Sequence, residues 1–364
     1  MLKKKIRLNS MTSFYIAWVM MVIHICIANS NMQAYSLSLF SYIAMLFFGI
    51  KIVTYKKYTL NEIFLMIMLM LWGYLASKSA DDMRVLWFAI VLVASKGIDF
   101  NKVVKYNFIT MLICCIIFIL CFIFGVSDEI IMQTTRGIRH SFGMGHPNMF
   151  SAYYIILVIQ YIYLKFDNLK IRELVVFMLF SLLVYYFTKS ITGLFTIILV
   201  LSIVFILRFI SLKIFNSKII VLILISGIIL FTIIPMIYNS SFIILDKMMT
   251  GRLRQANYYY IKYGISFFGS NINADLLNIY TDNILDMGYA KMLINNGVLY
   301  YLCVVIGYVV SMVKAYRNYK YNMIALMSCF IIYMFTENVA TYIFMNVTML
   351  LFSDILYKNN GILE

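Results

Sequence analysis

Residues 106–125 read YNFITMLICCIIFILCFIFG, a run in which no side chain is charged. An α-helix rises about 1.5 Å per residue, so a helix of about 20 residues crosses the hydrocarbon core of a bilayer, which is about 30 Å thick. A backbone in lipid must satisfy its hydrogen bonds internally, and a helix does so within one segment. This stretch therefore predicts that the chain crosses a membrane as a helix.

Similar apolar runs recur along the whole chain. Its hydrophobic share is 63%, against about half for a soluble domain, and its mean hydropathy is +0.91. We predict an all-α, polytopic helical bundle of about twelve transmembrane helices, forming one integral membrane domain over residues 1–364. The weakest span is 84–96, because it is short, and its failure to cross would invert the topology after it. The predicted spans are 13–30, 34–51, 60–77, 84–96, 106–125, 148–164, 173–189, 191–210, 218–237, 291–312, 322–336 and 339–357.

The net charge of +15 is distributed as a topology signal. Basic residues fall in short clusters separated by pairs of spans, the first being Lys3, Lys4, Lys5 and Arg7. With the N-terminus inside, about two thirds of the lysines and arginines face the cytoplasm, as the positive-inside rule requires. We therefore expect both termini to be cytoplasmic and expect no nucleic-acid partner. All six cysteines lie in predicted spans, which disfavours disulfides and structural zinc.

Two connections between the predicted spans are longer than the rest. Residues 126–147 form an external loop of middle size, and residues 238–290 form one long external loop. Loops of more than about 15 residues are usually functional when the rest of a domain is compact. The short polar turn at 188–193, which contains Lys189, faces the same compartment, so three polar elements are expected to converge there.

The segment 136–148 reads RGIRHSFGMGHPN and contains two of the three histidines. Polar and charged groups near lipid are costly, so a purpose beyond connecting two helices is indicated, and we interpret the segment as a phosphate-handling face. The alternative is a solvated loop with ordinary arginines. The sequence around His146 indicates a helix start, with this histidine as a proton carrier or a phosphate donor. Neither external histidine has a second metal ligand at suitable spacing.

The long loop carries the other candidates. Arg252 and Arg254 follow Gly251 and resemble a phosphate clamp, because guanidinium donors match phosphate oxygens, although pairing with the acids of the loop, among them Asp275 and Asp282, is the alternative. Asp286 lies at the rim of a span, where partial desolvation raises a carboxyl pKa toward that of a general base, or where it caps a helix. Glu337 lies where the last two spans meet, and its expected partner is an external arginine.

Taken in order, these fragments resemble the Wzy-type polysaccharide polymerases, which are related to the O-antigen ligases. The resemblance covers most of the chain in hydropathy and order. It implies a fold similar to that of the membrane-embedded GT-C glycosyltransferases. The residues that carry it are Arg136 with Ser141, Phe142, Gly143, Gly145, His146, Pro147 and Asn148; Lys189 through Gly193; Gly251 and Arg252 with Gly264, Phe268 and Gly269; Asp286 through Tyr289 with Leu293 and Gly297; and Glu337 with Asn346.

The resemblance implies a multi-pass enzyme of the bacterial inner membrane that acts on lipid-linked sugars. An undecaprenyl-pyrophosphate-linked glycan would donate its chain, at the outer face, to a hydroxyl of another lipid-linked repeat unit. Arg136, Arg252 and Arg254 would hold the pyrophosphate, and Asp286 or His146 would deprotonate the acceptor. Arg139, Lys189 and Glu337 complete the predicted substrate-binding set.

The same resemblance bears on cofactors and partners. The related enzymes work without a bound metal, and nothing in this sequence demands a cofactor. The lipid bilayer, a flippase and a chain-length regulator are the further implied partners. The related ligases carry a histidine where this chain has Asp286, which favours a polymerase over a ligase.

Two other functions stay open at this point. A flippase of lipid-linked oligosaccharides would share the spans and the basic character, but it should line a cavity with charges deep in its spans, whereas nearly all charges here lie at span ends. A ligase that moves finished chains to another acceptor is a variant of the polymerase.

Overall fold

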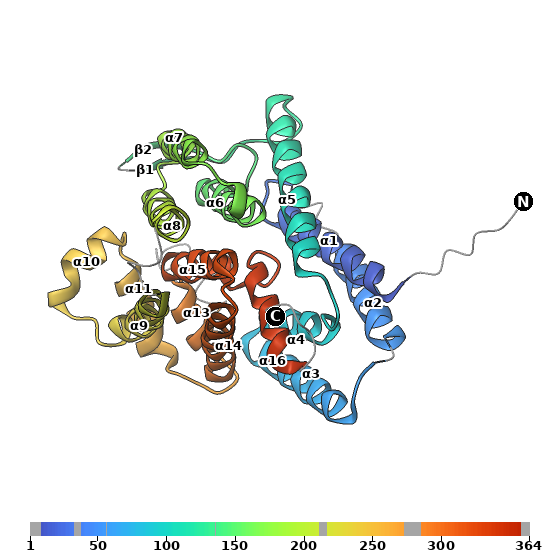
Figure 1. Ribbon diagram of the computed structural model, residues 1–364. Helices are drawn as coiled ribbons and strands as arrows, with labels where there is room; N and C mark the ends of the chain where they lie inside the picture. The colour runs from blue at the N-terminus through green and yellow to red at the C-terminus, as the bar shows by residue number, and fades with distance from the viewer. Residues whose placement is uncertain are drawn as a thin grey trace, which may run out of the picture.

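The computed structural model describes residues 9–32, 38–55, 57–134, 136–210, 217–272 and 285–357. The first basic cluster, Lys3 to Arg7, and the loop acids Asp275 and Asp282 lie outside the described residues. Within them the chain forms a bundle of helices with one short hairpin (Figure 1). The prediction of an all-α bundle is confirmed, and the hairpin is an addition to it.

The elements follow one another as helices joined mostly by short turns. Segments η2 to η5 are short 3₁₀ helices. The elements are α1 (Ser10–Ala28), α2 (Ser38–Thr54), α3 (Leu60–Ala80), α4 (Arg84–Ala94), α5 (Phe100–Ile123), β1 (Ile131–Thr134), β2 (Gly137–His140), α6 (Pro147–Lys165), η2 (Phe166–Asn168), α7 (Ile171–Thr188), α8 (Ile191–Phe209), α9 (Ser217–Met236), η3 (Ser240–Phe242), α10 (Ile243–Met248), α11 (Arg252–Tyr263), α13 (Gly288–Ile294), α14 (Val298–Arg317), α15 (Tyr321–Thr336), η4 (Asn338–Thr341), η5 (Val347–Phe352) and α16 (Ser353–Leu356).

Seven of the described helices are long and apolar enough to cross a membrane, namely α1, α3, α5, α6 with η2, α7, α8 and α14. The other predicted spans are shorter or broken, so the count of twelve is not confirmed. The predicted span 84–96 is α4, only 11 residues long, and its residues from Trp87 to Ala94 are all buried. A helix of that length rises about 16 Å, which is short for a bilayer. The chain still passes here from one end of the bundle to the other, because Arg84 bonds Thr341 at one end and Lys96 bonds Glu62 at the other, so the direction of the later helices is not inverted.

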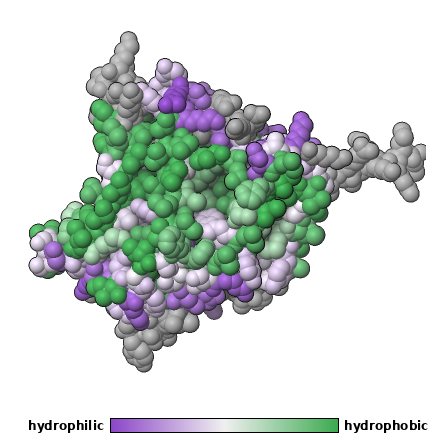
Figure 2. Space-filling view, turned by 90° about the horizontal axis from the view of Figure 1, so that it is seen from below, coloured by the Kyte–Doolittle hydropathy of each residue, from purple (hydrophilic) through white to green (hydrophobic). Residues whose placement is uncertain are grey.

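The outer surface of the bundle is apolar where long helices face outward. Large apolar side chains stand exposed on α3, α5 and α7, for example Phe64, Ile113 and Leu179. Figure 2 shows a broad hydrophobic band across one face, with hydrophilic residues gathered toward its edges. A patch of this size on a soluble monomer would be an interaction surface, and on a bundle of apolar helices it is suited to lipid.

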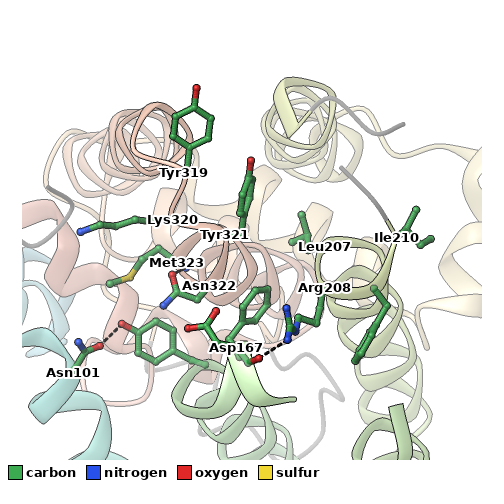
Figure 3. A pocket seen from close by; sticks show the side chains of 13 residues that line it. Asn101, Asp167, Leu207, Arg208, Ile210, Tyr319, Lys320, Tyr321, Asn322 and Met323 are labelled. Carbon is green, nitrogen blue, oxygen red and sulfur yellow. Dashed lines mark hydrogen bonds between the residues drawn. The ribbon is translucent and has the colours of Figure 1, made fainter. Parts of the chain in front are cut away.

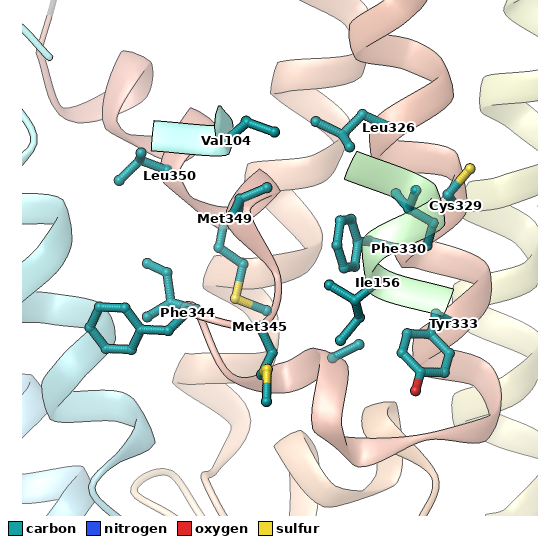
Figure 4. Packing of buried hydrophobic residues seen from close by; sticks show 14 of the residues in the cluster. Val104, Ile156, Leu326, Cys329, Phe330, Tyr333, Phe344, Met345, Met349 and Leu350 are labelled. Carbon is teal, nitrogen blue, oxygen red and sulfur yellow. The ribbon is translucent and has the colours of Figure 1, made fainter. Parts of the chain in front are cut away.

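The last predicted span, 339–357, is not one helix, and this corrects the prediction. It forms η4, η5 and α16, and it lies inside the bundle with Phe344, Met345 and Met349 buried between α5, α6 and α15 (Figure 4). Asn346 is fully buried, and its side chain bonds the Ala340 carbonyl and the Tyr308 hydroxyl, each at 2.8 Å. Irregular backbone is tolerated at this depth because protein surrounds it and supplies the hydrogen bonds.

The predicted span 291–312 is also divided, into α13 and α14. Gly297 separates the two helices with φ of +93°, a left-handed conformation that favours glycine. A Cβ on Gly297 would lie 2.5 Å from the backbone nitrogen of Gly269, so only a hydrogen fits between these two backbone segments. At the break, the start of α14 lies against the segment 266–270, because the Val298 N–H donates to the Ser266 carbonyl at 3.0 Å.

Helix ends define two ends of the bundle. We call the hairpin end the one that holds β1 and β2, the starts of α6 and α8, and the last turns of α1, α7 and α15. The hairpin pairs Ile131 with His140 and Thr134 with Gly137. The loop after it is bound to the end of α1, because the Gly145 N–H donates to the Asn29 carbonyl at 2.8 Å. The opposite end holds the start of α5, the ends of α6 and α8 and the turn between α14 and α15, and these line a larger cavity of about 630 Å³ (Figure 3).

Candidate functional site

A polar cavity of about 230 Å³ opens at the hairpin end, and we call it the arginine cavity. It forms where the hairpin, the starts of α6, α8 and α11, and the chain before α13 meet. Three external segments predicted to converge, 126–147, 188–193 and 238–290, all contribute to its wall. The lining residues are Thr134, Arg136, Arg139, Asn148, Ser190, Ile191, Thr192, Thr250, Arg252, Gln255 and Asp286.

Arg252 is positioned by the first turn of α11. Gly251 precedes it with φ of +84°, which turns the chain sharply into the helix. The buried carboxylate of Asp246 caps the helix, since one of its oxygens accepts from the N–H groups of Leu253 at 2.9 Å and Arg254 at 3.1 Å. Negative charge at a helix N-terminus is stabilising, so the cap holds this turn in place.

The guanidinium of Arg252 is 4% exposed and is held by two carboxylates. Its Nη2 lies 2.8 Å from Oε1 of Glu337 and 3.2 Å from Oδ2 of Asp286. Burial alone would lower the pKa of Arg252, but these two acids raise it above its ordinary value. Its buried Nη1 has no hydrogen-bond partner among the described residues, so the donors of that nitrogen remain unused.

Asp286 is the acid that faces the arginine cavity. Its side chain is 24% exposed, and it is reached by the charges of Arg252, Glu337 and Lys291. Burial is the largest influence and raises the pKa of Asp286 to about 7, with Glu337 also raising it and Arg252 opposing. A carboxylate with a pKa near neutrality suits proton transfer at physiological pH.

Glu337 lies behind Arg252 at the end of α15. Its Oε1 also accepts a hydrogen bond from the Thr192 hydroxyl on α8 at 3.2 Å. One turn earlier, Thr336 meets Thr196 of α8 at 3.1 Å between hydroxyl oxygens. Glu337 pairs with an arginine, as expected, and the partner is Arg252 of the long loop.

Arg139 and Arg136 supply further positive charge. Arg139, on β2, is buried and donates from Nε to the Thr188 carbonyl at 2.7 Å and from Nη2 to the Asn148 side chain. Burial is the first cause that lowers its pKa, and Arg136 is the second. Arg136 is exposed in the hairpin turn. The cavity thus presents three guanidinium groups against the one carboxylate in its lining.

His146 has a different place from the one predicted. It is the N-cap of α6, where its Nδ1 accepts from the Asn148 N–H at 3.0 Å, and it does not line the arginine cavity. The predicted helix start is therefore confirmed. Burial, with Arg139 and Arg252, lowers the pKa of His146 to about 4, so the ring is neutral near pH 7. With Nδ1 accepting, the neutral ring carries its proton on Nε2 and is a hydrogen-bond donor there.

Two predicted substrate-binding residues also lie outside the wall of the cavity. Lys189 ends α7 with φ of +50°, and its ammonium lies 4.5 Å from the ring centroid of Tyr186. The side chain of Arg254 is exposed, and its backbone N–H donates to the Asp246 carboxylate. The structure therefore brings together Arg136, Arg139, Arg252, Asp286 and Glu337, and leaves Lys189, Arg254 and His146 at its margins.

Sequence reasoning did not single out two side chains that shape the site. Asp246 is one of the acids of the long loop, and only the structure shows that it caps α11. Asn148 carries part of the family resemblance, but the sequence gives its side chain no partner. Its side-chain oxygen accepts a hydrogen bond from Arg139, and the spacing of the two residues in the sequence does not predict this contact.

No family model, curated protein or solved structure matches the chain. Among the described residues, no three His, Cys, Asp or Glu side chains are grouped to hold a metal ion.

Proposed function

We propose that this chain is a membrane glycosyltransferase that joins undecaprenyl-pyrophosphate-linked repeat units into a cell-surface polysaccharide. The observation that carries the proposal is the placement of Arg252. Two carboxylates hold its Nη2, its buried Nη1 has no hydrogen-bond partner among the described residues, and Arg252 lines a cavity together with Arg136 and Arg139. The proposed setting is the bacterial inner membrane, with both termini cytoplasmic and the hairpin end outside.

The charge of the cavity supports an anionic substrate. A guanidinium offers fixed paired donors that match phosphate oxygens, and three such groups converge here. Pyrophosphate is the leaving group of the proposed reaction, so negative charge grows on it as the sugar departs. Donors already placed around that charge stabilise the transition state more than the ground state.

Asp286 supports the second half of the reaction. In the proposed step, the acceptor hydroxyl oxygen bonds to the anomeric carbon of the donor while the bond from that carbon to the pyrophosphate oxygen breaks. The leaving group takes the electron pair of the broken bond, and the hydroxyl proton passes to the Asp286 carboxylate. A pKa of about 7 makes that carboxylate a base at neutral pH. His146 suits this role less, because its Nδ1 lone pair already receives the Asn148 N–H.

The proposal is tested by the size and the sidedness of lipid-linked glycans in cells that lack the protein. Single repeat units on the outer leaflet are expected, because export continues while polymerisation stops. Complementation with the wild-type chain should restore long chains, and Asp286→Asn at the same protein level should not. Units trapped on the inner leaflet would instead make the protein a flippase, and full-length lipid-linked chains would make it a ligase.

A further inference from the structure

A second polar cavity, of about 360 Å³, lies at the hairpin end beside the first, and we call it the Asp82 cavity. It is formed by the last turns of α1, the junction of α3 with α4, the start of α6 and the 3₁₀ segment after α15. None of its residues lines the arginine cavity. The lining residues are His24, Ile25, Ala28, Asn29, Asp82, Met83, Arg84, Met149, Asn338, Val339, Tyr342 and Met345.

The polar side chains of this cavity are fixed and balanced in charge. Nε of Arg84 lies 3.5 Å from Oδ2 of Asp82, whose Oδ1 accepts from the Arg84 N–H at 3.0 Å. Nη1 of Arg84 donates to the Thr341 hydroxyl at 2.9 Å. The side chains of Asp82 and Arg84 are 16% and 23% exposed, so both retain some open surface. Burial opposes the ionisation of Asp82, but Arg84 and Lys291 hold its pKa below its ordinary value.

This chemistry differs from that of the arginine cavity. There three guanidinium groups face one carboxylate, whereas here one guanidinium is compensated by one carboxylate and is accompanied by two asparagine side chains and the ring of Tyr342. Fixed donors and acceptors around an apolar or aromatic surface match the hydroxyls and the C–H face of a sugar. With Glu337 counted, the arginine cavity keeps one guanidinium uncompensated, whereas the Asp82 cavity keeps none and offers a phosphate less net positive charge.

A thin wall separates the two cavities. Glu337, which holds Arg252 in the arginine cavity, is followed by Asn338, which lines the Asp82 cavity. The Asn338 side chain donates to the Leu285 carbonyl at 2.8 Å, directly before Asp286. Lys291 lies among these groups, because its charge reaches Asp286 on one side and Asp82 with Arg84 on the other. The residues that form the Asp82 cavity are therefore bonded to the chain directly beside Asp286, which lines the arginine cavity.

We propose that the Asp82 cavity binds the terminal sugar of the acceptor glycan and presents its hydroxyl to Asp286. This inference rests on the proposed function, because a transferase requires two substrates at one base. Holding the acceptor next to the donor turns a bimolecular step into an effectively unimolecular one. Asp82 and Arg84 are then residues of the acceptor site, while Arg136, Arg139 and Arg252 serve the pyrophosphate of the donor.

The test is a binding measurement on the full chain in detergent. The probe is the repeat-unit oligosaccharide of the host polysaccharide, released from its lipid pyrophosphate, so that it carries no phosphate for the arginine cavity. Asp82→Asn is expected to raise the Kd at least tenfold. The matched control is Asp81→Asn, the same change at an exposed neighbour outside the cavity whose left-handed conformation asparagine tolerates, and it is expected to bind as the wild type does.

A second variant guards against misfolding of the first. Ala28→Leu adds bulk at the wall of the Asp82 cavity without removing a polar group and should also weaken binding. Wild-type affinity in both Asp82→Asn and Ala28→Leu, or no binding by the wild type, would overturn the inference. Either result would refute only the acceptor site. The glycan phenotype in cells would still test the polymerase proposal. An inner-leaflet phenotype would refute the polymerase whatever the probe does.

Discussion

Two clusters of buried charge, at the two ends of the bundle, show how a structural cluster differs from a candidate site. At the opposite end, Lys96 lies 2.7 and 2.6 Å from the two oxygens of Glu62 and 2.6 Å from the Lys57 carbonyl. An ammonium has three donors, so this lysine is saturated by protein. At the hairpin end, Arg252 has two carboxylate partners on one nitrogen and none among the described residues on the other.

The difference teaches that burial of charge alone does not mark function. A buried ion pair is kept when its partners satisfy each other, and its worth to stability is small or even negative against an apolar replacement. A buried donor left unused beside a cavity needs a further partner, because protein interiors rarely leave one orphaned. Cavity size is a poorer guide: the cavity of about 630 Å³ around Arg208 and Asp167 is larger than the arginine cavity (Figure 3). Nε of Arg208 is also buried without a hydrogen-bond partner among the described residues, but Arg208 is the one arginine in the lining of that cavity.

The sharpest test of this contrast is Arg252→Lys. Lysine keeps the positive charge near Glu337 and Asp286 but loses the paired donors that we assign to pyrophosphate. We expect the initial rate of glycan transfer to fall by about 10²- to 10³-fold, the range for losing one transition-state donor. The control is Arg254→Lys, the same change two residues on at an exposed position, which should transfer at close to the wild-type rate. Equal rates for the two variants would remove Arg252 from the site.

The second test concerns Asp286 and pH. A base must be deprotonated, and burial raises the pKa of this carboxyl to about 7. Transfer should therefore increase as pH rises through about 7 and decline below it, which initial rates between about pH 5.5 and 8.5 would record. Asp286→Asn should lower the rate by about 10²- to 10⁴-fold and abolish the inflection. An unchanged inflection in that variant would assign the titration to another group.

A smaller effect is expected from Arg136→Ala. This arginine is exposed in the hairpin turn, so its removal should leave the thermal unfolding midpoint unchanged. A charge-assisted bond to phosphate contributes about 1.5–3 kcal/mol, so the KM for the donor should rise about tenfold or more. The KM for the acceptor should stay as it is. A shift in the acceptor KM instead would mean that the two cavities have been assigned the wrong substrates.

The smallest effect on transfer is expected at the opposite end. Lys96→Met leaves the Glu62 carboxylate, which is 13% exposed, without its partner and should destabilise the protein by about 3 kcal/mol. Adding Glu62→Gln should recover part of that loss, because no unpaired charge remains. The rate per folded molecule should match the wild type in both variants. A loss of rate without a loss of stability would end the distinction between the two clusters.

Much of the membrane architecture was predictable from local sequence. The apolar runs at 106–125 and 191–210 became α5 and α8, since long runs without charge have few alternatives to a helix. The polar segments 136–148 and 188–193 were correctly expected to meet. The order of the helices is enough to predict this meeting, because helix ends on one side of a bundle lie near one another.

The side-chain partners were not predictable in the same way. Arg252 precedes Glu337 by 85 positions, and Arg84 precedes Thr341 by 257, so nothing local links them. Asn346 lies in a run hydrophobic enough to be read as a span, yet its buried amide holds 3₁₀ turns in the middle of the bundle. Hydropathy gives only the free energy of transferring each residue separately from water to an apolar phase. It cannot show that a polar group will find its hydrogen-bond partners inside the folded protein.

The sequence by itself determined that the chain is a helical membrane protein and which polar segments share one end, because transfer free energy and charge asymmetry act residue by residue. Tertiary structure alone decided which charges meet. It placed Arg252 between Asp286 and Glu337, kept Arg254 and Lys189 outside the arginine cavity, and put Asp82 and Arg84 in the second cavity. The physical reason is that pairing depends on the packing of helices distant in the chain, which fixes distances of a few ångströms that no sequence spacing encodes.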